Sequence, residues 1–140
     1  MNNIKVMAMS NRKVGNDFES EFCKILFDNG FWVHNLAQNK AGQPADVIAV
    51  KDGKAYLIDC KVCSGKTFNI SRIEENQNLA MYLWCERGNG YGYFAIKFEE
   101  NIYMISLFSL NHAKKKTFTE EWFSENGFTL NGWLIERWKQ

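Results

Sequence analysis

Hydrophobic residues in the first quarter of the chain recur at helical spacing. They are Val14, Phe18, Phe22, Ile25 and Leu26. This pattern predicts a helix with one apolar face that ends at Asn29-Gly30, a pair typical of helix termination. Residues 31–36 then favour a short strand, and residues 37–45 a polar loop that holds the only proline, Pro44.

Two β-rich runs follow, at residues 47–51 and 54–60. Between them lies Asp52-Gly53, a pair that favours a two-residue hairpin turn. In such a hairpin residue 51 faces residue 54, so the pattern predicts an antiparallel pair whose register is set by the turn.

The rest of the chain predicts four further elements. These are a helix at 73–86, a loop at 88–92, and antiparallel strands at 93–98 and 102–107. The expected fold class is α/β, with a central mixed sheet flanked by helices. We expect a single domain over residues 1–140, with its core at about 14–107 and a C-terminal extension at 108–140. A short helix near 119–124 is the only element that the extension suggests.

Composition adds little to this picture. Hydrophobic residues make up 46% of the chain and charged residues 24%, which excludes a disordered chain. Lys and Arg number 17 against 16 Asp and Glu, so the strong positive balance common in nucleic-acid-binding proteins is missing. With no signal-peptide pattern and no apolar run of about 18 residues, a cytoplasmic location is expected, where the four cysteines would be reduced thiols.

The predicted hairpin brings three charged residues together. Asp46 falls opposite Asp59, and opposed residues have Cβ atoms about 4.5–5.5 Å apart. Side chains alternate along a strand, so Lys61 points to the same side as Asp59. The other positions on that face are apolar, which places the charges at one end of a hydrophobic sheet surface.

Two carboxylates at this distance repel each other unless a cation neutralises them. A hard divalent ion with oxygen ligands, Mg²⁺ or in its place Mn²⁺, is the natural partner. Lys61 could then orient or help deprotonate a metal-bound water, or stabilise charge on a phosphate oxygen. A purely structural interpretation also stands, in which Asp46 caps the strand entry and Asp59 pairs with Lys61.

The combination of Pro44-Ala45-Asp46, the hairpin and Asp59-Cys60-Lys61 resembles the PD-(D/E)XK nuclease superfamily. Its members carry an acidic residue at the start of one strand and an acidic-x-Lys triplet on the next. The resemblance implies a restriction-endonuclease-like fold. Two departures are that the family more often has Glu where Asp59 stands, and that the proline lies two residues before Asp46 instead of adjacent to it.

Two further motifs are similar to Holliday-junction resolvases of the Hjc and RecU type. The first is Gly15-Asn16-Asp17-Phe18-Glu19, followed by Gly30-Phe31, which looks like their opening helix. The second is Ile73-Glu74-Glu75-Asn76-Gln77, where a glutamine follows an isoleucine by four. The resemblance covers residues 14–107. It implies that Glu19 completes the metal site and that Gln77 supports it, although Glu19 could equally face solvent and Gln77 could bond to backbone.

The resemblance implies a Mg²⁺-dependent endonuclease acting on branched or four-way DNA. Asp46, Asp59 and Glu19 would bind the metal, with the backbone carbonyl of Cys60 as a further ligand, and Lys61 would act on the water. Basic residues at Lys13, Lys66 and Arg72 are candidate phosphate contacts from their positions. A homodimer is implied because a four-way junction offers two symmetric strands. Its interface could come from aromatic residues with no assigned core, namely Trp122, Phe123, Trp133 and Trp138.

Three alternatives remain open at this stage. Cys60 and Cys63 form a CxxC, which could be a zinc or redox pair, although a structural zinc site usually has a second ligand pair at similar spacing. The fold could be an inactive nuclease that binds only DNA or a protein. The same chemistry could also act on other DNA structures, such as linear duplex.

Overall fold

The described chain alternates helices and strands around one large sheet. The computed structural model describes residues 10–36 and 45–138. The helical elements are α2 (Ser10–Asp28), the 3-10 turn η1 (Ile70–Arg72), α3 (Glu75–Trp84), the π-helical turn η2 (Cys85–Asn89), α4 (Leu107–Ala113), α5 (Glu120–Asn126) and α6 (Leu130–Trp138). The strands are β1 (Trp32–Asn35), β2 (Val47–Lys51), β3 (Lys54–Cys63), β4 (Thr67–Asn69), β5 (Tyr93–Phe98), β6 (Asn101–Ser106), β7 (Thr117–Thr119) and β8 (Phe128–Thr129).

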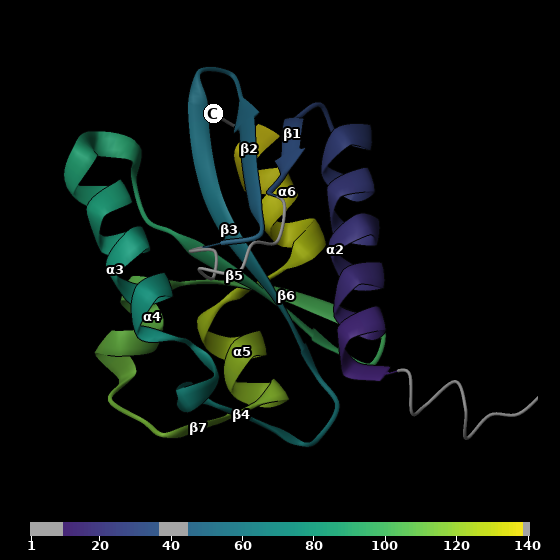
Figure 1. The fold of residues 1–140 in the computed structure, drawn as a ribbon, viewed down its shortest axis with the longest axis vertical. Coiled ribbons are helices and arrows are strands. Elements are labelled where there is room, and N and C mark those ends of the chain that lie inside the picture. The colour runs from purple at the N-terminus through teal and green to yellow at the C-terminus, as the bar shows by residue number, and fades with distance from the viewer. Residues whose placement is uncertain (1–9, 37–44, 139–140) are drawn as a thin grey trace, which may run out of the picture.

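The six-stranded sheet has the order β1-β2-β3-β5-β6-β8. All neighbours run antiparallel except β3 and β5, which are parallel and are joined through α3. The predicted mixed sheet is therefore confirmed, with β3 in its interior (Figure 1). A separate two-stranded sheet pairs β4 with β7.

The end of α2 and the β2–β3 hairpin form as their turn residues predict. Gly30 has φ of +91°, and the Phe31 amide donates to the Leu26 carbonyl at 3.1 Å, which is the pattern of a Schellman helix end. Asp52 and Gly53 both have positive φ, as a type I′ turn requires. Lys51 pairs with Lys54, so the predicted register is confirmed.

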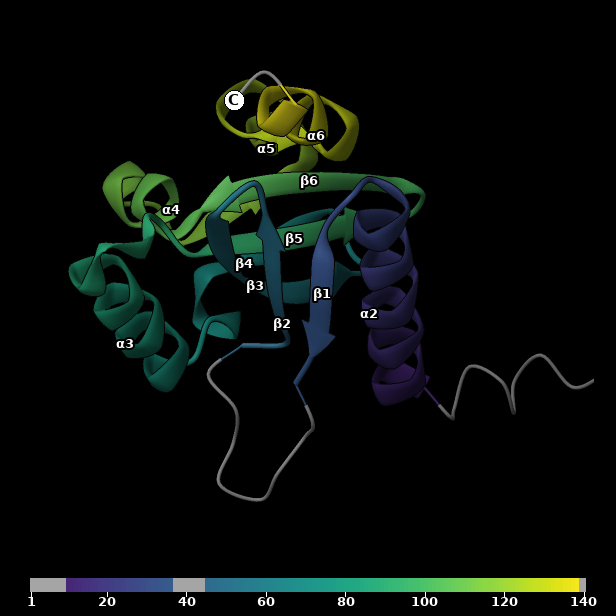
Figure 2. The same ribbon diagram turned by 90° about the horizontal axis from the view of Figure 1, so that it is seen from above.

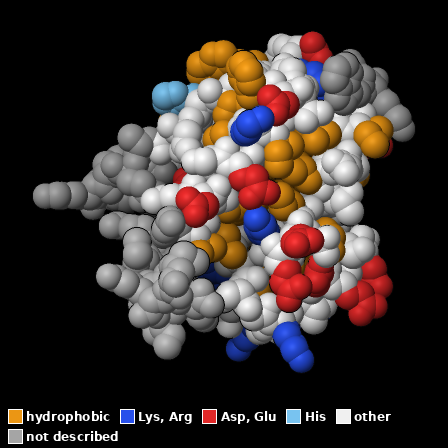
Figure 3. Space-filling view, turned by 90° about the vertical axis from the view of Figure 1, so that its right-hand side faces the viewer, with side chains coloured by type: hydrophobic (Ala, Val, Ile, Leu, Met, Phe, Trp, Pro, Cys, Tyr) orange, Lys and Arg blue, Asp and Glu red, His pale blue; other side chains and the backbone are white. Residues whose placement is uncertain are grey.

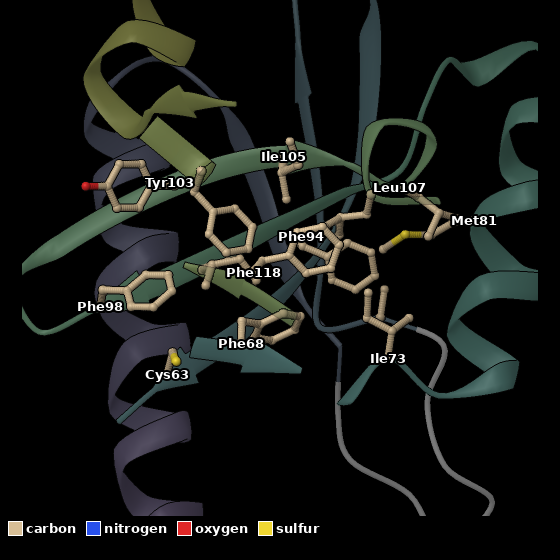
Figure 4. Packing of buried hydrophobic residues seen from close by; sticks show 14 of the residues in the cluster. Cys63, Phe68, Ile73, Met81, Phe94, Phe98, Tyr103, Ile105, Leu107 and Phe118 are labelled. Carbon is tan, nitrogen blue, oxygen red and sulfur yellow. The ribbon is translucent and has the colours of Figure 1, made fainter. Parts of the chain in front are cut away.

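Two hydrophobic clusters cover the two faces of the sheet. One face packs against α2 and α6, through Phe18, Phe22 and Trp133 among others. The other packs against α3, α4, α5 and the small sheet, and Figure 4 shows Phe94 and Phe118 at its centre. Seen from above, α2 and α3 lie on opposite sides of the β2–β3 hairpin (Figure 2). None of the helices in the described residues is long and apolar enough to cross a membrane.

The C-terminal segment corrects one expectation from the sequence. Phe123 and Trp133 are fully buried, and Trp133 stacks on Phe31 at 5.8 Å and meets Tyr56 edge-on at 5.3 Å. The hypothesis that these two side chains form a dimer interface is wrong, because they fill the protomer's own core. Trp122 packs partly buried against Phe118, and the Trp138 side chain lies outside the described part. The short helix near 119–124 is confirmed as α5.

Candidate active site

Asp46 is fixed at the entrance to β2, just before the ladder with β3 begins. Its amide donates to the Ile58 carbonyl at 3.1 Å, and its Oδ2 accepts from the Cys60 amide at 2.8 Å. Asp46 is buried. The Cys60 amide as a positioning donor was not expected from the sequence, although antiparallel pairing of the two strands brings residue 60 beside residue 46.

Asp59 and Lys61 lie on one face of β3, as strand alternation predicts. Lys61 Nζ is 3.1 Å from Asp59 Oδ2, and both side chains are largely buried. The contact is an ion pair without hydrogen-bond geometry, because Oδ2 has no hydrogen-bond partner. A buried carboxylate oxygen in this state is short of one ligand.

The buried face of α2 brings a third carboxylate to the same place. Glu19 is only 8% exposed, so the solvent-facing alternative for this residue is excluded. Burial, followed by the charge of Asp46 and a hydrogen bond with it, raises the pKa of Glu19 to about 7. Glu19 and Asp46 therefore interact directly, and the spacing of α2 accounts for it because Glu19 lies on the same helix face as buried Phe22 and Leu26, three and seven residues later.

The pKa of Asp59 is raised further than that of Glu19. Burial first, and then the negative charge of Asp46, raise the pKa of Asp59 to about 8, while Lys61 acts in the opposite direction. Two carboxyl groups with raised pKa values beside a third carboxylate form a cluster in which full ionisation needs a cation. The site is thus built for either a proton or a metal ion at neutral pH.

The carboxylate set also fits the donor chemistry of a hard divalent ion, for which oxygen ligands are preferred. Asp59 Oδ2, which is paired with the Lys61 ammonium but accepts no hydrogen bond, is the candidate coordinating atom. As the side chains stand, no group of three or more His, Cys, Asp or Glu among the described residues forms a ready-made metal cluster. Asp46 and Asp59 are the two carboxylates of the hairpin that converge most directly.

The cysteines of the CxxC sequence do not form a pair. Cys63 packs in the cluster on the α3 face and donates its thiol to the Thr67 carbonyl at 3.2 Å. Cys60 packs on the α2 face beside Cys23. Burial raises the pKa of the Cys60 thiol well above its usual value. Because the two side chains lie on opposite faces of β3, neither a shared zinc ion nor a redox disulfide is compatible with this arrangement.

Gln77 is buried on the face of α3 that packs towards the sheet, together with Met81. Its Oε1 accepts from the Glu74 amide at 3.1 Å, which completes a capping box. This is the backbone bond that the sequence left open as the alternative role for Gln77. Its support of the carboxylate site stays a prediction.

The candidate phosphate contacts are spread over the surface near the end of β3. Lys66 is exposed, and Arg72 is exposed while donating to the Val62 carbonyl at 2.7 Å. Lys13 belongs to α2, but its side chain lies outside the described residues. On the face shown in Figure 3, Lys and Arg side chains are interspersed with acidic and hydrophobic ones, which agrees with the net charge of +1.

Comparisons with known proteins agree with this geometry. The family model described as "Archaeal holliday junction resolvase (hjc)" matches residues 9–138. A solved structure of Hjc from Archaeoglobus fulgidus, a Holliday junction resolvase from an archaeal hyperthermophile, is similar with a TM-score of 0.67. It shares 15% identity, and the match covers 86% of this chain and 98% of that one. No curated protein sequence gives a significant match.

The family match spans nearly the whole chain, including the C-terminal segment that the sequence motifs had left outside the resemblance. Nucleases of this family are generally dependent on a divalent metal and bind DNA junctions. Buried Asp46 and Asp59 and half-buried Lys61 lie where the hairpin predicts them. The chain therefore belongs to the archaeal Holliday junction resolvase family and is a junction-resolving endonuclease.

Proposed function

We propose that Asp46, Asp59 and Glu19 bind the catalytic Mg²⁺, for which Mn²⁺ can substitute, and that Lys61 acts on the attacking water at a four-way DNA junction. The observation that supports this most directly is the buried carboxylate cluster. Burial, and then the charge of Asp46, raise the pKa values of Glu19 and Asp59, and Asp59 Oδ2 lacks a hydrogen bond. A bound cation would both relieve the repulsion between the carboxylates and coordinate Asp59 Oδ2.

The protein frame holds each of these groups in a fixed place. The Cys60 amide orients Asp46 by donating to its Oδ2. The rigid central strand β3 holds Asp59 and Lys61 on one face. The backbone carbonyl of Cys60 is a further candidate ligand. When bound, a divalent ion acidifies a water molecule and offsets charge on the phosphate.

Lys61 is the residue that acts on the attacking water and on the phosphate in the proposed reaction. Its ammonium is held beside Asp59 at 3.1 Å and is only partly accessible to solvent. From there it can donate hydrogen bonds that orient the attacking water, and it can stabilise the negative charge that develops on a phosphate oxygen. Gln77 would support this arrangement from α3, since its side-chain amide group has donors as well as the bonded Oε1.

The remaining proposals concern DNA and assembly. Lys66 and Arg72 would contact backbone phosphates beside the catalytic strand, and Lys13 would do so from α2. A C2 homodimer would place two active centres on the two symmetric strands of the junction. Analytical ultracentrifugation with and without a synthetic junction tests the dimer, and a monomer under both conditions would contradict it.

The function is tested by cleavage of a synthetic four-way junction, beside linear duplex and single strand of equal length. Each reaction contains Mg²⁺ or EDTA, and Asp59→Asn serves as the inactive control. Paired symmetric nicks that appear only on the junction and only with Mg²⁺ are expected. Metal-dependent cutting of all three substrates would retain the proposed metal site and contradict junction selectivity. No cutting by the unmodified protein would contradict the proposed catalytic site.

A further inference from the structure

A second polar hollow lies at the opposite end of the β2–β3 hairpin from the carboxylates. Its volume is about 410 Å³, and it is lined by the hairpin, the segment after α3, and the end of α6. The polar or charged side chains in this lining include Lys54, Tyr56, Asn89, Tyr93 and Arg137. Figure 1 shows the hairpin tip and the C-terminal end of α6 at the same end of the molecule. The proposed hydrolytic reaction uses none of these residues.

Arg137 has guanidinium donors without hydrogen-bond partners, which an anionic ligand could satisfy. Its guanidinium is held over the Trp133 ring at 4.7 Å and the Tyr56 ring at 5.7 Å. Its Nε and Nη1 are shielded from solvent and have no hydrogen-bond partner. Buried donors without acceptors are costly, and a charged donor more so. An oxygen-rich anion in the adjoining hollow would satisfy these N–H groups once a small rotation of the guanidinium exposes them.

The rest of the lining suits the same ligand. Lys54 adds a second positive charge, and phenol and amide groups of Tyr56, Tyr93 and Asn89 can donate hydrogen bonds. Burial raises the pKa of Tyr56, which keeps its phenol protonated and able to donate. The backbone at Gly88 and Gly90 is open to close approach, because no other atom lies within 4 Å of the point that a Cβ would occupy at either position.

Asp52 borders a much smaller adjoining hollow together with Arg137. It does not satisfy the guanidinium, because Nε and Nη1 remain without a hydrogen bond. Among the described residues, the main hollow is lined by two cationic side chains and by no acidic ones. Its charge therefore favours an anion over a cation or a neutral molecule.

We propose that this hollow binds a phosphate group, with Arg137 and Lys54 as its principal contacts. Planar guanidinium donors match the geometry of phosphate oxygens. Lys54 precedes Asp59 by five residues along the same strand, which places the hollow roughly 17 Å from the carboxylates. The phosphate is either one in an arm of the DNA junction, in which case the inference rests on the proposed function, or a free phosphate or pyrophosphate.

The free-anion source is tested by thermal unfolding of the full chain with sodium pyrophosphate against sodium chloride at equal ionic strength. A ligand that binds only the folded state raises the melting temperature in a saturable way. The variants are Arg137→Gln and Lys54→Gln, and the matched control is Lys24→Gln, which removes one positive charge from an exposed ion pair on α2. The rise is expected in the unmodified protein and the control, and is expected to be lost in both variants. Lys54→Gln keeps the test valid if Arg137→Gln fails to fold.

The DNA source is tested by junction binding in EDTA over a range of salt concentrations. Loss of one phosphate contact is expected to weaken binding about tenfold and to lower the salt dependence by about one counterion, against little change in Lys24→Gln. Either response supports the phosphate site and identifies its source. Variants that match Lys24→Gln in both assays would overturn it. Metal-dependent junction cleavage by the unmodified protein would persist in that case, so a failure here is distinct from a failure of the proposed function.

Discussion

Replacing Asp59 by Asn is expected to stabilise the metal-free protein at neutral and alkaline pH while abolishing strand cleavage. Burial and the charge of Asp46 raise the pKa of Asp59 from 3.8 to about 8. The folded state thus holds the proton more tightly than the unfolded state does. The stability that this proton confers is complete below about pH 4 and is lost as the pH rises through about 8.

The magnitude follows from the size of this shift. In the unfolded chain the Asp59 carboxyl is ionised at pH 7, which lies about three units above its pKa. In the folded protein the same carboxyl is still largely protonated at pH 7. This difference corresponds to on the order of 4 kcal/mol of folding free energy that Asn would not lose. For a domain of this size, that is a change in melting temperature of roughly 10 °C or more.

The assay is urea unfolding in EDTA at pH 5 and pH 8. The matched control is Asp28→Asn, which removes an exposed carboxylate from the Lys24 pair and is expected to show little pH-dependent gain. Asp59→Asn should gain stability over the unmodified protein at pH 8 and much less at pH 5. Added Mg²⁺ should stabilise the unmodified protein and not the variant. An Asp59→Asn variant that loses stability equally at both pH values would refute the reasoning.

Four other predictions follow from the site and the fold. Lys61→Met should lower single-turnover cleavage of a junction roughly 100- to 1000-fold while leaving junction binding in EDTA nearly unchanged, and a variant that cleaves normally would remove Lys61 from the mechanism. Gly127→Ala should lower the urea midpoint, because its Cβ would lie 2.7 Å from the Met104 carbonyl oxygen, and equal midpoints would contradict this contact. Trp133→Ala should lower the free energy of unfolding, measured by urea titration, by about 3–5 kcal/mol. Deletion of residues 109–140 should give a chain that circular dichroism shows to be unfolded. A folded, soluble dimer after the deletion would contradict the role of this segment in the core.

The local chemistry of the hairpin could be predicted from sequence because its turn fixes its register. Asp52-Gly53 sets the register that brings Asp46 opposite Asp59, and strand alternation puts Asp59 and Lys61 on one face, both without any long-range information. The burial of Trp133 could not be predicted in this way. Its partners, Phe31 and Tyr56, lie about a hundred and about eighty residues earlier in the chain, and no local pattern relates such distant positions.

The same limit applies to charged groups outside the recognised motifs. From the sequence, Arg137 is indistinguishable from an ordinary charged residue of a helix. Only the packing of α6 against the sheet shows that two of its donor atoms are buried. Glu19 is an intermediate case. Its place next to buried Phe18 allowed either a solvent-facing or a site-facing side chain, and the docking of α2 beside β2 decided between them.

The parallel pairing of β3 with β5 has a consequence for biosynthesis. Residue 58 pairs with residue 93, so the strand that carries Asp59 gains its second neighbour only after β5 has left the ribosome. The α2 face of the sheet is closed later still, by Trp133. Every proposed catalytic residue is therefore synthesised before the strands and helices that complete the sheet and bury the site. Cutting activity is therefore expected to arise only after α6 has emerged from the ribosome.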